Sequence, residues 1–226
     1  MEWSALWLSL KLGGLTVLLL LPAALFVGRA LAYRHFRGKP LAEALLAVPL
    51  VLPPTVVGYY LLVGLGGQSA IGQWVAHWSG HTLVFHFSGL VIASIIVNIP
   101  FAVQPIQRAF ESIPHEVRDA AACCGMSFWR TLLTVELPLA WPGVLTALVL
   151  TFAHTLGEFG VVLMVGGNIP GETKTIAIAI YDRVQAFDFA AAGRMSLLLL
   201  VFSIAVLALA NGLSRRFGRR HGLPEL

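Results

Sequence analysis

The chain has 226 residues, of which 58% are hydrophobic and only 12% are charged, and its mean hydropathy is +0.82. Soluble domains carry about 25% charged residues, so this composition excludes a disordered chain, an ordinary nucleic-acid-binding domain and a disulfide-stapled secreted domain. It indicates an integral membrane protein, in which the net charge of +4 belongs to basic cytoplasmic loops.

Runs without charged residues locate five membrane-spanning helices. No Asp, Glu, Lys or Arg occurs from Leu12 to Gly28, and the gap from Ala44 to Gln107 is long enough for two crossings of about 20 residues each. Two later gaps locate the last two spans. The predicted spans lie near residues 6–32, 42–65, 84–107, 137–165 and 194–213. We therefore expect one all-α membrane domain over residues 5–213, followed by a basic tail over residues 214–226.

The distribution of Lys and Arg sets the expected orientation of these spans. Eleven of the 15 lie on one side of the predicted membrane and four on the other, which makes the first side cytoplasmic. The N-terminus is then outside and the C-terminus cytoplasmic. A cleaved signal peptide in place of the first span is disfavoured, because the basic cluster follows the apolar run instead of preceding it. The arginines of the tail fix this topology or anchor to anionic lipid heads, and nucleic-acid binding is not expected of so short a run.

Helix breakers interrupt the second predicted span. Proline bends a helix and frees backbone carbonyls, which neighbouring helices, water or a cavity must satisfy within lipid. The breakers have two interpretations: a packing kink, which is common in membrane helices and is favoured on this feature alone, or a bend that shapes a translocation path. The candidate path residues here are Pro53, Pro54 and Thr55.

Three histidines lie between the second predicted span and the start of the third. His77, His81 and His86 occur beside Trp74 and Trp78, a composition that suits a membrane–water interface. Although His77 and His81 have the spacing of one helical turn, no Cys or acidic residue joins them. We therefore expect solvated interfacial side chains in a loop, and no metal site.

The longest polar stretch on the cytoplasmic side, residues 108–136, predicts two short helices joined by a glycine. Gly125 ends the first helix, and Ser127 caps a second one that begins with Phe128, Trp129 and Arg130. Pro138 marks where the chain turns into the fourth span. Exposed aromatic residues and Arg are typical binding anchors, so the loop is expected to contact a partner.

The spacing of this loop resembles that of a known family. Asp119-Ala120-Ala121, then three residues, Gly125, nine residues and Val135-Glu136-Leu137-Pro138 is similar to the "EAA" loop of ABC importer membrane subunits, with Asp for Glu and Val for Ile. In that family the loop forms coupling helices that dock in a groove of the ATP-binding subunit. The alternative is an amphipathic loop that lies on the membrane. The resemblance implies an ATPase-coupling loop made by Asp119, Ala120, Ala121, Gly125, Phe128, Trp129, Arg130, Leu137 and Pro138.

Three further stretches narrow the resemblance to molybdate permeases. Leu52–Tyr60 is similar to their second helix, Leu156–Gly160 to their fourth, and Asn168–Ile176 to the outer loop that follows. Sulfate permeases share the Gly-Glu-Phe-Gly element but are usually longer, with six spans. The compact five-span plan therefore favours a molybdate permease of the type I importer fold.

The resemblance implies a permease subunit that moves molybdate across the bacterial inner membrane by alternating access. Its implied partners are a second copy of the chain, two copies of an ABC ATPase, a periplasmic molybdate-binding protein and membrane lipid. The chain has no Gly-x-x-x-x-Gly-Lys-Ser/Thr loop, so we expect no enzymatic activity and no bound cofactor, with ATP and magnesium on the ATPase. The alternatives are a permease for sulfate or tungstate, a stand-alone channel or secondary carrier, and a membrane-embedded enzyme.

Glu158 is the one carboxylate deep in the fourth predicted span. A charge there is costly unless it is paired, hydrated or protonated, and His154 lies one helical turn earlier. The pair is a candidate gate or, equally, a fixed contact between helices. Cys123 and Cys124 are expected to be small buried side chains instead of reactive thiols.

The outer loop over residues 166–190 carries charges of both signs. By itself this pattern predicts a solvated loop with a short helix. The family resemblance implies a surface that receives a substrate-binding protein, with candidate contacts at Asn168, Glu172, Thr173 and Lys174.

Overall fold

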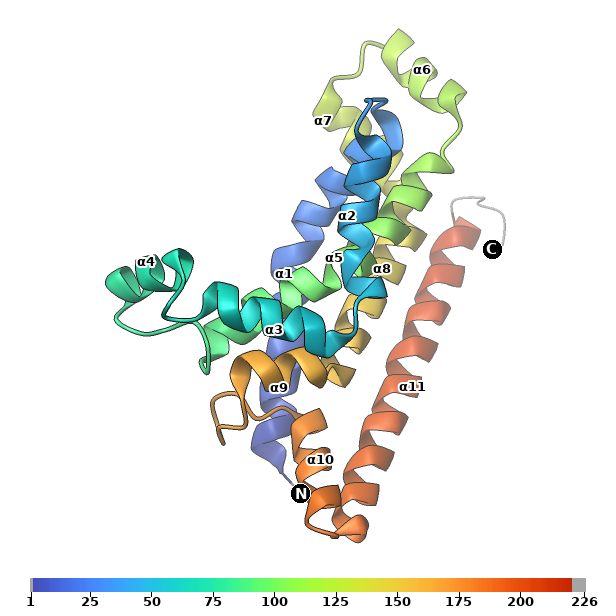
Figure 1. The fold of residues 1–226 in the computed structure, drawn as a ribbon. Helices are drawn as coiled ribbons and strands as arrows, with labels where there is room; N and C mark the ends of the chain where they lie inside the picture. Colours follow the sequence, from blue (N-terminus) through green and yellow to red (C-terminus); the bar gives the residue numbers. More distant parts are fainter. Residues whose placement is uncertain (1, 221–226) are drawn as a thin grey trace.

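The computed structural model describes residues 2–220, and within that range the regular structure is helical, as predicted. The helices are α1 (Trp3–Tyr33), α2 (Lys39–Val51), α3 (Pro54–Leu65), α4 (Ala70–Ser79), α5 (Phe87–Glu111), α6 (His115–Cys123), α7 (Phe128–Thr131), a π-helical turn (Leu132–Glu136), α8 (Leu137–Gly157), α9 (Gly160–Gly166), α10 (Ile176–Gln185) and α11 (Phe189–Arg220). Figure 1 shows the long helices α1, α5, α8 and α11 running along roughly one direction, with shorter helices at both ends and on one flank.

Among the described residues, four helical segments are long and apolar enough to cross a membrane, and the number is five if the bent pair α2–α3 counts as one span. The four are Trp3–Tyr33, Phe87–Glu111, Phe128–Gly157 and Phe189–Leu209. This agrees with the five predicted spans in number and approximate place. Of the predicted tail, residues 214–220 continue α11, whereas residues 221–226 lie outside the described part of the chain.

Small residues let α1, α5 and α8 pack closely around one apolar core. A Cβ atom added at Gly28 of α1 would lie 2.8 Å from the Ile106 side chain of α5, and one at Gly143 of α8 would lie 2.3 Å from Ala109. Without a hydrophobic force between helices in lipid, such close approach is the main source of association. Helix α11 lies beside α8 and exposes a row of aliphatic side chains, consistent with a lipid-facing helix.

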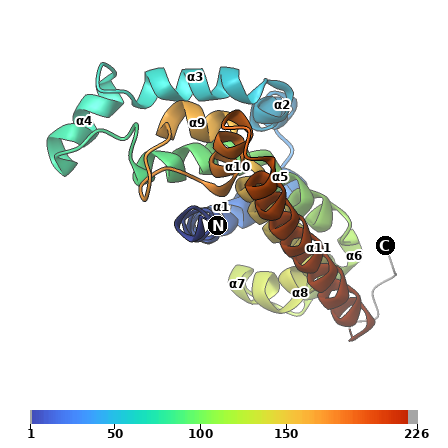
Figure 2. The same ribbon diagram turned by 90° about the horizontal axis from the view of Figure 1, so that it is seen from below.

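The second predicted span is not one straight helix. Helices α2 and α3 meet at a bend of 107°. Leu52 is extended with ψ 140°, because a residue before proline is pushed out of the helical region, and α3 then starts at Pro54. Figures 1 and 2 show α3 crossing the bundle beside α9 instead of running along α5. The interruption predicted from the prolines is thus confirmed, and the predicted span over 42–65 consists of two helices that meet at this bend.

The fourth predicted span, 137–165, is wrong at both ends. At its start the chain does not turn, because α7, the π-helical turn and α8 form one continuous helix. The N–H of Leu137 donates to the carbonyl of Leu132, so the turn before Pro138 is wider than an α-helical one. A wide turn accommodates Pro138, which has no N–H and whose ring would clash with the carbonyl four residues earlier. At the other end the helix stops at Gly157, and Glu158 is extended.

The segment between α3 and α5 contains a helix where the sequence predicted a loop. The Ser69 hydroxyl accepts a hydrogen bond from the Gly72 N–H at 2.9 Å and caps α4, and Gly80, with φ +76°, ends it. Trp74 and Trp78 project from this helix and are exposed. The serine cap was the missed signal, since it precedes a run with helical spacing.

Candidate functional site

Helices α6 and α7 lie together at one end of the long helices (Figure 1). Gly125, with φ +68°, ends α6, and the Met126 N–H donates back to the Ala121 carbonyl. The Ser127 hydroxyl then accepts a hydrogen bond from the Arg130 N–H at 3.4 Å and caps α7. The glycine end of the first short helix and the start of a second helix after Ser127 are therefore confirmed. The second helix is not short, because it continues through the π-helical turn into α8.

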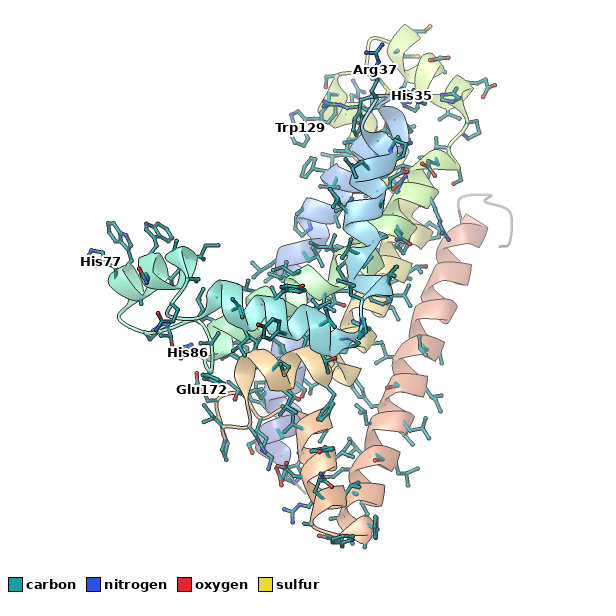
Figure 3. All side chains as sticks on the ribbon, viewed as in Figure 1. His35, Arg37, His77, His86, Trp129 and Glu172 are labelled. Atoms are coloured by element: carbon teal, nitrogen blue, oxygen red, sulfur yellow. The ribbon has the colours of Figure 1, made fainter. Side chains whose placement is uncertain are left out.

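The predicted coupling residues divide into an exposed set and a packed set. Asp119, Ala120, Gly125 and the run Phe128–Arg130 are exposed, and Trp129 is 58% exposed. Figure 3 shows Trp129 at the outer edge of this end. Three members face the protein instead: Ala121 is buried, and Leu137 and Pro138 are partly buried. The exposed set can thus meet a partner, while the packed set holds the segment to the bundle.

The cysteines correct one prediction. Cys123 and Cys124 are both exposed, so their expected burial is wrong. On α6, Val117 packs against the apolar core and Ala121 is buried, whereas Cys124, which shares their predicted face, is exposed.

A buried carboxylate that the sequence analysis did not select lies beneath α6 and α7. The Glu136 side chain is 0% exposed. Arg29 of α1 donates to it from Nε at 2.6 Å and from Nη2 at 3.0 Å, and Arg118 of α6 places Nε 3.3 Å from Oε1. The available signal was that Arg29 and Glu136 each border a long uncharged run, but nothing in the sequence pairs residues 107 positions apart.

The two broken helices lie against each other. A Cβ atom at Gly160, the first residue of α9, would lie 2.9 Å from the Pro54 Cβ at the start of α3. One turn further along α3, a Cβ atom at Gly58 would lie 2.8 Å from the Met164 Cβ. The structure therefore brings Pro54 close to the break at Glu158 and so joins two parts of the candidate path.

Glu158 is 7% exposed and caps α9, because its Oε1 accepts a hydrogen bond from the Val161 N–H at 2.9 Å. Its other oxygen lies 3.8 Å from the His154 Nε2. The His154 Nδ1 is 3.1 Å from the Asn98 Oδ1, and the Asn98 amide donates to Thr155 at 3.0 Å. This polar chain links α5 to the end of α8. The sequence analysis predicted the His154–Glu158 pair but missed Asn98, which lies in an apolar stretch.

The outer-loop candidates lie at the opposite end of the bundle from α6. The Lys174 Nζ lies 2.8 Å from Asp182 and 3.0 Å from Glu2, and the Asn168 amide donates to both Asp182 oxygens at 3.0 Å. Thr173 is 0% exposed, and its hydroxyl accepts from a backbone N–H of the same turn. A direct Thr173 contact with a partner therefore does not fit this structure, and Lys174 is held within the chain.

Hydrogen bonds and ion pairs shift the pKa values of this outer network. Burial opposes ionisation of Glu2 and Asp182, yet hydrogen bonds from Lys174 to both groups, and from Arg183 to Glu2, outweigh it and lower both pKa values. The hydrogen bond to Asp182, together with Glu2, raises the pKa of Lys174 against a smaller effect of burial. All three groups are thereby stabilised in their charged forms.

The histidines of the α4 region do not gather into one cluster. His86 stacks on His81 with ring centroids 4.2 Å apart, and its Nε2 lies 3.2 Å from a Glu172 oxygen. Figure 3 shows His77 on α4, away from His86 and Glu172. Within residues 2–220, no group of three or more His, Cys, Asp or Glu side chains is placed to hold a metal ion.

Long apolar helices, a capped two-helix segment at one end and two broken helices in contact define a membrane permease subunit. The chain belongs to the family of binding-protein-dependent transport system inner membrane components, whose sequence profile matches residues 21–221. Proteins of this family are ABC importer permeases of the bacterial inner membrane, so the predicted family is confirmed.

Two related proteins and one solved structure show what this chain resembles in sequence and in fold. The chain is 46% identical over 216 residues to the molybdenum transport system permease protein ModB of Azotobacter vinelandii, which covers 96% of this chain and 95% of that one. It is 32% identical over 186 residues to the sulfate transport system permease protein CysT of Escherichia coli K12, covering 82% and 67%. A bacterial ABC transporter that imports alginate has the same fold, with a TM-score of 0.77 at 18% identity over 94% of this chain and 78% of that one.

Proposed function

We propose that the chain is the permease subunit of an ATP-driven molybdate importer. The observation that carries this proposal is the 46% identity to a molybdenum permease over nearly the full length of both chains. The sulfate permease is less similar, and this chain covers only 67% of its length. Sulfate and tungstate are the alternative substrates, because both are tetrahedral dianions like molybdate.

The end that carries α6 and α7 is assigned to the cytoplasm. Figure 3 places Arg37 and His35 at this end, together with Trp129. Lys39 is beside the same end, where its Nζ lies 3.8 Å from Glu111 at the end of α5. The basic residues of the first loop thus share one side with the coupling loop, as the positive-inside rule requires. The N-terminus then lies outside.

Two permease copies, each contacting one ABC ATPase, form the functional unit in this proposal. The exposed face of α3, with Tyr59, Tyr60 and Val63, leaves apolar surface for a second copy at the broken helices. The ATPases bind ATP and magnesium, and their closure moves the coupling loops. The broken helices then open the path outward, and ATP hydrolysis resets it. Glu158 does not bind the anion directly, since a carboxylate repels a dianion.

A periplasmic binding protein delivers the anion at the opposite end. The surface available to it is the turn over residues 168–171, which is exposed, with Glu172 beside it. Glu172 also accepts a hydrogen bond from the Phe87 N–H at 3.2 Å, so docking there would reach the start of α5. Dependence on a binding protein is consistent with the family to which the chain belongs.

Uptake of radiolabelled molybdate into proteoliposomes tests the proposal. The vesicles contain this chain with its candidate ATPase and binding protein, with or without ATP, and with excess sulfate as competitor. We expect ATP-dependent uptake that sulfate does not suppress. Suppression by sulfate would indicate that sulfate is the substrate. Uptake that depends on neither ATP nor the ATPase would favour a channel or a secondary carrier.

A further inference from the structure

We propose that Glu136 is a positioning residue that clamps the coupling loop to α1 through Arg29 and Arg118, so that the loop and the spans move as one body. This inference rests on the proposed function, because it assigns the contact through which motion of the ATPase reaches the membrane. It concerns a residue that neither binds the anion nor belongs to the exposed docking set.

The contacts leave Glu136 no unpaired oxygen. Oε2 accepts from the Arg29 Nε, and Oε1 lies within reach of both Arg29 and Arg118. A carboxylate that is fully removed from solvent loses several kcal/mol of hydration, which only close, well-oriented partners offset. Arg29 presents its planar fork to both oxygens, a geometry that lysine cannot reproduce. The two arginines thus determine where this carboxylate lies.

The three charged groups come from three separate parts of the chain. Arg29 belongs to the end of α1, Arg118 to coupling helix α6, and Glu136 to the π-helical turn that leads into α8. The turn buries Leu132 and Glu136 together, while Leu133 stays 58% exposed. One carboxylate therefore joins the first coupling helix to two long helices.

Aromatic rings extend the clamp to the second coupling helix. The Arg29 guanidinium lies 4.5 Å from the ring centre of Phe128, and that ring lies edge-on to Trp129 at 5.2 Å. Trp129 in turn meets Phe26 of α1, with ring centroids 6.1 Å apart. Cation–π contacts of this kind are attractive, and more so when they are shielded from water. Helices α6 and α7 are thus both tied to α1 around the same buried charge.

A displacement of the loop relative to α1 has to separate these charges in a medium of low dielectric constant. Separation of a buried ion pair is much more costly than the slight rotation of packed helices as a unit. A force applied to the exposed face of α6 and α7 is therefore transmitted to α1 and α8. Without the charge on Glu136, the loop can move while the helices stay in place.

The first experiment measures the mobility of the loop in the permease alone. A nitroxide spin label on Cys123, in a Cys124→Ser background, reports motion of α6 in lipid nanodiscs without any ATPase. We expect Glu136→Gln to increase label mobility, and Glu111→Gln to leave it unchanged. Glu111 is the matched control, because its side chain is 41% exposed at the same end of the bundle. Equal mobility in wild type and Glu136→Gln would overturn the clamp.

The second experiment measures molybdate imported per ATP hydrolysed in the assembled complex. We expect Glu136→Gln to lower this ratio about tenfold while the ATPase still copurifies, within the range of ordinary coupling energies. If Glu136→Gln fails to insert, Arg118→Lys replaces it, because this variant keeps the positive charge and lies at a partly exposed site. We expect a smaller fall in the ratio of molybdate imported to ATP hydrolysed. An unchanged ratio in the variants that assemble would also overturn the clamp. If the wild-type complex imports no molybdate, the proposed function is wrong. The mobility of the spin label in the permease alone still tests the clamp.

Discussion

The two ends of this permease hold charged clusters of opposite character. At the end that carries α6 and α7, which the proposal assigns to the cytoplasm, one fully buried carboxylate lies between two arginines, at 2.6 and 3.3 Å. At the outer end the charges of Glu2, Lys174, Asp182, Arg183 and Asp188 form a wider network whose members are partly exposed. Water screens the outer contacts, whereas the Glu136 carboxylate is fully buried between arginines that are 18% and 29% exposed. Burial of the shared carboxylate, and not the number of ion pairs, therefore distinguishes the two clusters.

The largest expected effect is at the buried cluster. Glu136→Ala leaves Arg29 without its partner, and removal of one member of a buried pair costs about 3 kcal/mol or more. Unfolding of the purified permease in mixed micelles measures the loss of stability. Glu111→Ala should cost less than about 1 kcal/mol, because exposed pairs contribute little. Similar losses in both variants would remove the contrast between buried and exposed charges.

The next effect concerns the exposed face of the cytoplasmic end. Trp129→Ala should weaken ATPase binding by about 2 kcal/mol, or about thirtyfold, if Trp129 is an interface anchor. Copurification of the ATPase at graded concentrations measures the change. Trp74→Ala is the control, since Trp74 is also exposed but lies on α4. Unchanged ATPase binding in Trp129→Ala would count against the docking role.

Gly125→Pro is a companion variant that tests the backbone of the same loop. Proline cannot adopt φ +68°, so the join between α6 and α7 has to rearrange. We expect the protein to insert normally and uptake to fall. Membrane insertion is checked by fractionation, and normal uptake in this variant would show that the join is not needed for coupling.

A smaller effect is expected at the break between α8 and α9, where burial is nearly complete but the ionic contact is long. Glu158→Gln keeps an oxygen that accepts from the Val161 N–H and loses only the charge that lies 3.8 Å from His154. We expect a cost of about 1 kcal/mol and an altered uptake rate. Glu158→Ala also removes the helix cap and should cost more. Equal stability and uptake in all three proteins would make Glu158 incidental.

The smallest effect is the response of the outer network to pH. The pKa values of Glu2 and Asp182 are lowered on folding, so their contribution is fully present above the ordinary pKa of these groups and is lost as pH falls through the lowered folded-state values. The pKa of Lys174 is raised, so its contribution is fully present below the ordinary pKa of lysine and is lost only as pH rises through the raised folded-state value. The free energy of unfolding, measured as a function of pH, should fall less at acid pH in Asp182→Asn than in the wild type. If it falls equally in both proteins, Asp182 does not cause the loss of stability at acid pH.

The sequence predicts local structure at the cytoplasmic end better than long-range contacts. Gly125 and Ser127 encode the end of one helix and the start of the next, so the two-helix loop follows from neighbouring residues. The pairing of Arg29 with Glu136 depends on how α1 and α8 pack, which no local pattern records. The same limit explains the cysteines, whose exposure is set by where α6 leaves the bundle.

The broken helices show a second limit. Proline at positions 53 and 54 predicts a bend, but its angle of 107° is set by packing of α3 on α9. At Glu158 no proline marks the break, and the apolar run on both sides predicts one long span. The carboxylate competes for the N–H groups of the following turn, so it starts a new helix where hydropathy alone continues the old one.

The π-helical turn gives the motif spacing a rotational meaning. Each residue of an α-helix advances the chain by about 100° around its axis. The turn over Leu132–Glu136 holds one residue more than an α-helical turn, as the bond from Leu137 to Leu132 shows. The wider turn takes up this extra residue, so α7 is not rotated by the further angle of about 100° that one more residue of regular α-helix would add. The nine residues between Gly125 and Val135 therefore set the direction of Trp129 together with the winding of the turn over Leu132–Glu136.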